Sequence, residues 1–211
     1  FRVGEDGPTH EPVEQEAQIR LMEKLKNHHG RNSMLVLRPA DAKETTVAWS
    51  MAMSNTQTPT ALILSRQGIA DLPAGNCYED ARRGAYIVAA SDENPDVVMV
   101  ASGSEVSTLQ AGAELLRKDG LRCRIVSVPS EGLFRSQSKD YQESVIPQGS
   151  TVFGMTAGLP VNLQSFLIGA SPASRIWGLE SFGFSAPYKV LDEKLGYTAE
   201  NVYRQVKEIL K

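Results

Sequence analysis

The sequence has few of the residues that build metal centres or disulfide frameworks. It holds two cysteines and three histidines in 211 residues, and none stands in the spacing of a metal site. Cys77 and Cys123 have no ligand pattern around them, which argues against a disulfide scaffold and is typical of a reducing compartment. We therefore expect a cytoplasmic protein in which Cys123 is a buried free thiol.

Long apolar runs and dense basic runs are missing as well. No stretch approaches the roughly 18 apolar residues of a membrane span, so we expect no membrane-spanning part. The net charge is −3 without a cluster of Lys or Arg, which argues against nucleic acid as the main partner. A Gly-x-Ser-x-Gly nucleophile turn is also absent. What remains, with 41% hydrophobic and 22% charged residues, is the composition of a globular protein with a buried core.

Short apolar runs alternate with amphipathic segments, as in α/β proteins. The runs predict strands at 34–37, 60–64, 85–89, 96–101, 123–128, 151–155 and 175–179. Four-residue spacing of Val13, Ala17, Leu21 and Leu25 predicts a helix with a buried apolar stripe. We expect this helix to end near Gly30.

The chain divides at a stretch with glycine, proline and no periodicity. Residues 68–84 are interpreted as a linker. They separate residues 1–67, called here the first unit, from residues 85–211, the second unit. We predict an α/β fold of two three-layer units with largely parallel sheets, the first unit being incomplete.

Two places carry candidate site residues. Asp6 and His10 stand four residues apart on a loop built by Gly7 and Pro8. A carboxylate there can accept a hydrogen bond from a substrate hydroxyl, and an imidazole can form one with a reacting oxygen. The alternative is that the two side chains only stabilise the turn. Arg66 follows the strand at 60–64, where ligands gather in parallel sheets. It fits a phosphate-binding arginine or a structural ion pair.

The segment Ser102-Gly103-Ser104-Glu105 also follows a strand and precedes a helix. Such a position can bind an anion. Its spacing equally matches a capping box with Ser102 as the N-cap, and we favour that interpretation because the glycine-rich fingerprint is absent.

Five motifs in order resemble the transketolase family. They are 4–14 (GEDGPTHEPVE), 37–41 (LRPAD), 64–67 (LSRQ), 101–106 (ASGSEV) and 182–187 (FGFSAP). The resemblance covers essentially the whole chain and makes 1–67 similar to the end of the pyrimidine-binding domain. Residues 85–211 are similar to the family's C-terminal domain.

Function and site roles follow from this resemblance as expectations. It implies transfer of a two-carbon ketol unit between sugar phosphates, in the pentose phosphate pathway, by a homodimer with thiamine diphosphate and a divalent cation, Mg²⁺ or Ca²⁺. It implies that Asp6 reads a substrate hydroxyl, that His10 is catalytic beside the reacting carbons, and that Arg66 binds the sugar phosphate. The cofactor supplies the carbanion chemistry and the protein supplies orientation.

The family's Gly-Asp-Gly cofactor motif and the segment with its activating glutamate do not occur in this sequence. We therefore expect a piece of a longer enzyme that is inactive alone and binds neither cofactor nor metal. Two alternatives stay open: a fragment of 1-deoxyxylulose-5-phosphate synthase, which has a similar loop, and a non-catalytic dimerisation or regulatory module.

Overall fold

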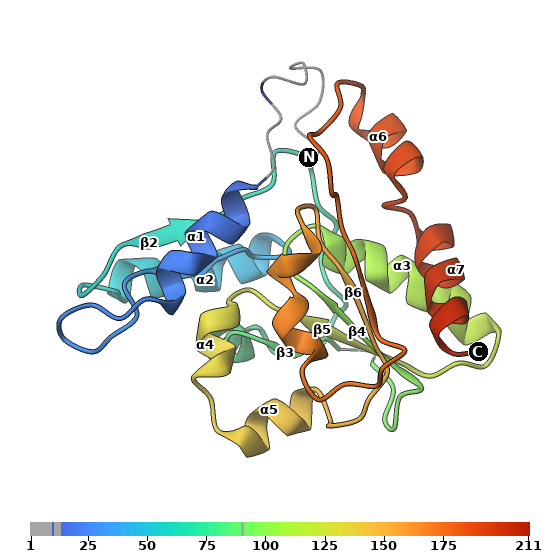
Figure 1. The fold of residues 1–211 in the computed structure, drawn as a ribbon, viewed down its shortest axis with the longest axis horizontal. Helices are drawn as coiled ribbons and strands as arrows, with labels where there is room; N and C mark the ends of the chain where they lie inside the picture. Colours follow the sequence, from blue (N-terminus) through green and yellow to red (C-terminus); the bar gives the residue numbers. More distant parts are fainter. Residues whose placement is uncertain (1–9, 11–13, 90) are drawn as a thin grey trace.

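Two separate sheets organise the chain in the computed structural model, which describes His10, 14–89 and 91–211. In the first unit, β1 (Leu35–Leu37) and β2 (Thr60–Leu62) form a two-stranded parallel sheet. The second unit holds a five-stranded sheet in the order β3-β5-β4-β6-β7 (Figure 1). The predicted α/β class with mostly parallel sheets is confirmed.

The five-stranded sheet is parallel except at one edge. Its strands are β3 (Tyr86–Ile87), β4 (Val97–Ala101), β5 (Cys123–Ser127), β6 (Val152–Met155) and β7 (Arg175–Trp177). Only β3 runs antiparallel, beside β5. It is shorter than the strand predicted at 85–89.

The central strand β4 separates two apolar layers. Val97 and Met99 pack in a cluster with α3 (Glu105–Lys118) and α7 (Ala199–Ile209). Val98 and Val100 point into a second cluster, which includes Phe134 of α4 (Glu131–Arg135) and Val145 of α5 (Lys139–Val145). Successive residues of β4 thus point to opposite sides, and the strand is buried on both faces. The sheet, with helices packed on each side, forms the three layers of the second unit.

A further expectation for the second unit is met. Cys123 is a buried free thiol, and burial raises its pKa to about 11. The last helix, α7, begins after Thr198, whose side chain caps it by accepting from the amide of Asn201. The remaining elements are the 3₁₀ helices η3 (Pro160–Asn162) and η4 (Gln164–Leu167) and the helix α6 (Tyr188–Leu195).

The first helix does not bury the predicted stripe. Helix α1 (Gln15–Lys24) buries Arg20 and Glu23, whereas Leu21 and Leu25 are 58% and 56% exposed. The prediction of a buried apolar stripe is therefore wrong for this chain. The reason is that α1 packs against η3 and α4 of the second unit as well as β1, and that side offers polar partners.

The predicted end of this helix, near Gly30, is also wrong. It stops at Lys24, and a turn follows in which Lys26 and Asn32 form an antiparallel bridge. His28 and His29 lie in that turn and are exposed. They therefore do not sit at a helix C-terminus.

The connecting residues 68–84 contain a short helix and a buried side chain. They include the 3₁₀ helix η2 (Tyr78–Arg83), which packs against α2 (Ala42–Ser54). Leu72 is buried, and its amide donates to Asp41 at 2.9 Å. None of the helices in the described residues is long and apolar enough to cross a membrane.

Candidate functional site

A cavity of about 620 Å³ opens between the two units. Arg38 lines it directly after β1, and Arg66 lines it from the segment that follows β2, four residues past the end of the strand at Leu62. The second unit contributes Ser104 and Thr108 near the start of α3, Gly158 after β6, and Tyr188 and Asp192 of α6. The carboxyl ends of the two parallel strands thus face a hollow whose opposite wall is the second unit, as expected for ligand sites in α/β proteins.

The structure treats the three predicted site residues differently. Arg66 is exposed and lines the cavity. His10 is exposed and is not among the residues that line it. Asp6 lies outside the described residues. Of the two residues that the structure describes, Arg66 lines the cavity and His10 does not, and the roles of all three remain predictions.

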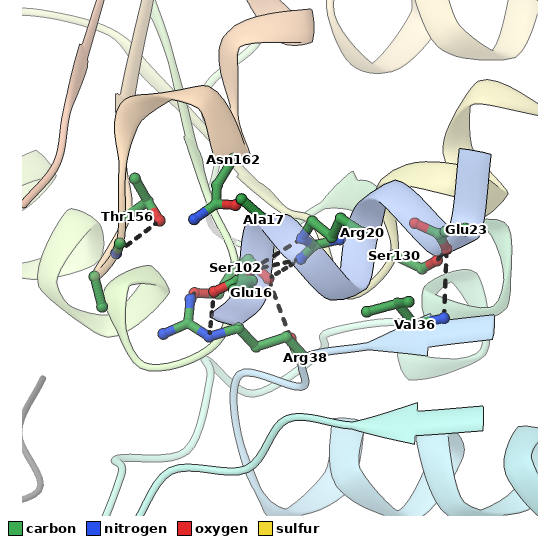
Figure 2. A network of polar contacts seen from close by, with 12 residues as sticks. Glu16, Ala17, Arg20, Glu23, Val36, Arg38, Ser102, Ser130, Thr156 and Asn162 are labelled. Atoms are coloured by element: carbon green, nitrogen blue, oxygen red, sulfur yellow. Dashed lines mark hydrogen bonds and ion pairs between the residues drawn. The ribbon is translucent and has the colours of Figure 1, made fainter. Parts of the chain in front are cut away.

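Beneath the cavity lies a buried network of charges, which Figure 2 shows from close by. The Arg38 guanidinium is 2.6 Å from a carboxylate oxygen of Glu105 and 3.5 Å from one of Glu16. Arg38 also donates to the main-chain carbonyl of Ser102. Arg38 and Glu16 belong to the first unit and Glu105 to the second, so the network joins them.

The network continues into α1. Arg20 donates to Glu16 at 2.9 Å and to the Ser102 hydroxyl at 3.3 Å (Figure 2). Burial raises the pKa of the Glu16 carboxyl, but the charges of Arg38 and Arg20 outweigh burial and bring it below its ordinary value. Burial lowers the pKa of Arg38, and Glu105 and Glu16 more than reverse this. Glu16 and Arg38 therefore favour their charged forms.

Ser102 does not cap the following helix, contrary to our prediction. Helix α3 starts at Glu105, and Ser104 precedes it without a capping bond from its side chain. The Ser102 hydroxyl instead accepts from Arg20 and donates to the Arg38 carbonyl at 3.4 Å. Its neighbour Gly103 has a φ of +64°, and an added Cβ would lie 2.8 Å from the Arg38 guanidinium carbon. Residues 102 and 103 therefore pack against Arg38 and hydrogen-bond to it.

Potential metal ligands do not cluster in the part of the chain that the structure describes. It contains no group of three or more His, Cys, Asp or Glu side chains that could hold a metal ion. The polar groups lining the cavity, Arg66 among them, suit a hydroxylated anion.

Sequence reasoning missed Arg38 and its partners. Arg38 follows the apolar run at 34–37 just as Arg66 follows the strand at 60–64, and the same rule for strand ends applies to both. That signal was available in the sequence. The pairing of Arg38 with Glu105 was not, because it joins residues that are 67 positions apart.

Two family models match this chain. The pyrimidine-binding domain of transketolase matches residues 1–70. The transketolase-like C-terminal domain matches residues 84–198.

Curated relatives match along nearly its whole length. Transketolase from Staphylococcus aureus is 41% identical over 207 residues, which is 97% of this chain and 30% of the relative. Transketolase from Halalkalibacterium halodurans is 38% identical over 213 residues, or 99% of this chain and 30% of the relative. The chain thus spans about 30% of the length of these relatives.

Solved structures agree in fold. Transketolase from Leishmania mexicana has a TM-score of 0.86 and 38% identity, covering 99% of this chain and 28% of that one. A Pichia stipitis transketolase in complex with sedoheptulose 7-phosphate has a TM-score of 0.83 and 31% identity, covering 98% and 28%. With a family model matching more than half of its residues, the chain belongs to the transketolase family.

Proposed function

We propose that this chain is part of a transketolase that transfers a two-carbon ketol unit between sugar phosphates in the pentose phosphate pathway. Arg66 binds the sugar phosphate, Asp6 reads a substrate hydroxyl, and His10 stands beside the reacting carbons. The observation that carries the proposal is the place of Arg66, in the segment that follows β2 and on the wall of the cavity. Pichia stipitis relatives that match this chain are described in complex with xylulose 5-phosphate and sedoheptulose 7-phosphate.

The partners and cofactor of the whole enzyme belong to the same proposal. Thiamine diphosphate and a divalent cation supply the carbanion chemistry, held by residues that this chain does not contain. The enzyme is a cytoplasmic homodimer. This chain's own contribution is to bind and orient the sugar phosphate, because a guanidinium can give a phosphate two parallel hydrogen bonds.

The test is Arg66→Ala in the full-length enzyme with thiamine diphosphate and Mg²⁺. A hydrogen bond to a charged group contributes roughly 1.5–3 kcal/mol, so kcat/KM for phosphorylated sugars should fall about ten- to a few hundred-fold. Substrates without a phosphate never make the contact, so their kcat/KM should change little. Arg66→Lys should recover part of the loss, because an ammonium lacks the planar fork.

Two controls accompany this experiment. Arg31→Ala removes the same charge from an exposed position in the turn and should leave kcat/KM unchanged. The Arg66 variants must keep the melting temperature and the cofactor affinity of the wild type. Equal losses for phosphorylated and unphosphorylated substrates, with the fold intact, would show that Arg66 does not read the phosphate. The isolated chain, free of host enzyme, should give no turnover above the blank.

A further inference from the structure

In the sequence, Asp6 and His10 lie within nine residues of Gln15, where α1 begins, so whatever fixes the start of this helix limits where these two residues can lie. We propose that Glu14 is a positioning residue, which locks the loop to residues 158–162 of the second unit. This inference rests on the proposed function, because it assigns the second unit a part in ketol transfer: it holds the substrate loop of the first unit in place.

Glu14 connects the two units with both carboxylate oxygens. Its Oε1 accepts from the amide of Ala17 at 3.0 Å and so caps α1. Its Oε2 accepts from the amide of Leu159 and from Nδ2 of Asn162, the latter at 2.8 Å. Asn162 is buried. One side chain thus caps the helix and binds the second unit.

A glycine of the second unit makes room for this carboxylate. A Cβ added at Gly158 would lie 2.3 Å from Oε2 of Glu14 and 2.7 Å from Nδ2 of Asn162. Since carbon and oxygen cannot approach so closely, any side chain at 158 would displace Glu14 from its partners. The ion pair of Arg38 with Glu105 and Glu16 lies at the same end of α1 and reinforces the contact.

The far end of the helix provides a matched control. Glu23 accepts from the Ser130 hydroxyl at 2.9 Å and from the amide of Gly132 at 3.1 Å. A Cβ added at Gly132 would lie 2.2 Å from the Glu23 carboxyl carbon. The same chemistry thus joins the two units twice, about 13 Å apart along the helix. Of these two contacts, the one made by Glu14 lies nearer in sequence to Asp6 and His10.

The experiment compares two substitutions at each end in the full-length enzyme with thiamine diphosphate and Mg²⁺. Gly158→Ala and Gly132→Ala each fill the space that a glutamate occupies, at backbone angles open to alanine. Glu14→Gln and Glu23→Gln keep the shape of the side chain but replace one carboxylate oxygen with an NH₂ group. This group can only donate, and it would face the N–H groups that now donate to the carboxylate. Melting temperature, kcat and KM are measured for all four with xylulose 5-phosphate and ribose 5-phosphate.

The proposal expects the two ends to differ in kcat and not in stability. All four variants should lose melting temperature to a similar extent. Gly158→Ala and Glu14→Gln should lower kcat roughly 10- to 100-fold, because small misplacements of reacting groups cost that much. Their KM should stay within about threefold, because Arg66 is untouched. Gly132→Ala and Glu23→Gln should keep kcat within about twofold of the wild type. Equal kcat losses at both ends, or no loss at either, would overturn the proposal.

Hydrogen exchange gives a readout that does not depend on activity. The peptide covering residues 4–12 should exchange faster in Gly158→Ala than in the wild type, and at the wild-type rate in Gly132→Ala. Unchanged exchange in both would overturn the positioning role even if kcat fell. A wild-type full-length enzyme without ketol transfer would instead overturn the proposed function, and the exchange pattern would still decide whether Glu14 holds the loop.

Discussion

The two units bury different kinds of side chain. In the described part of the first unit, the buried residues are six apolar ones (Val36, Leu37, Pro39, Ala40, Val47 and Ala48) and five charged ones (Arg20, Glu23, Arg38, Asp41 and Glu44). The second unit buries two large apolar clusters on either side of its sheet. The second unit therefore has a large apolar core of its own, whereas nearly half of the buried residues of the first are charged and need polar partners.

The buried charges of the first unit find those partners across the boundary. Glu44 accepts from the Tyr86 hydroxyl at 2.8 Å and from the Ser127 hydroxyl at 2.7 Å. Arg38 and Glu23 likewise bond to the second unit. Since a buried charge without partners is strongly unfavourable, the first unit can bury these residues only when the second is present. The comparison teaches that folding of the first unit depends on the second.

The largest expected effect is on the first unit expressed by itself. Residues 1–67 alone should show no cooperative unfolding, because ordering costs roughly 1–2 kcal/mol per residue and so small an apolar core cannot offset it. Residues 71–211 alone should unfold cooperatively. Circular dichroism during a urea titration distinguishes the two.

Mixing the two pieces sharpens this test. Added 71–211 should restore helical signal to 1–67 beyond the sum of the separate spectra, because it returns the partners of Arg38, Glu23 and Glu44. Cooperative unfolding of 1–67 without its partner would show that the first unit is independent and that the comparison is wrong.

The buried Glu44 predicts how the stability of the chain varies with pH. Burial raises the pKa of its carboxyl, and the nearby charge of Asp41, which caps the same helix, adds to the rise. The hydrogen bonds from the Tyr86 and Ser127 hydroxyls lower this pKa, but they do not cancel the effect of burial. The folded state therefore keeps a proton that the unfolded state has already released. The free energy of unfolding should fall as pH rises from about 4.5 through the raised pKa, and below that window the contribution is fully present.

Glu44→Gln isolates this contribution, because an amide does not titrate. The loss of unfolding free energy between about pH 4.5 and 7.5 should be smaller in the variant than in the wild type, as measured by urea denaturation at each pH. Glu93→Gln makes the same change of charge at an exposed position and serves as the control. A pH dependence equal to that of the wild type in Glu44→Gln would contradict the prediction.

Much of the fold could be predicted from the sequence where a pattern is local. The strand at 97–101 can be recognised in the sequence as a short apolar run, because both of its faces pack against apolar layers. The strand at 60–64 was predicted from the same pattern; it ends two residues earlier, at Leu62, and Arg66 lines the cavity from the segment that follows. These predictions needed no knowledge of distant partners.

The rest of the site depends on contacts between units, which periodicity does not report. Nothing local distinguishes the buried Arg20 and Glu23 from charges on a solvated face, yet Arg20 bonds to Ser102 and Glu23 to Ser130. Ser102 was misassigned for the same reason, since the spacing of a capping box is local and its partner Arg20 is 82 residues away. The sequence indicates that α1 is amphipathic but not which of its faces meets a neighbour.

The smallest expected effect tests that face directly. If the stripe through Leu21 were buried, Leu21→Ala would cost about 2–5 kcal/mol of unfolding free energy. Because Leu21 is 58% exposed and alanine favours helix slightly more than leucine, the change in this chain should stay within about 0.5 kcal/mol. Leu37→Ala is the matched control: it makes the same substitution in the same unit, but at a fully buried position in β1, so it should cost the full 2–5 kcal/mol. Urea denaturation of both variants at one pH measures the difference. Similar losses at the two positions would mean that the apolar side of α1 is covered, and that the first unit has more of an apolar core than its buried charges indicate.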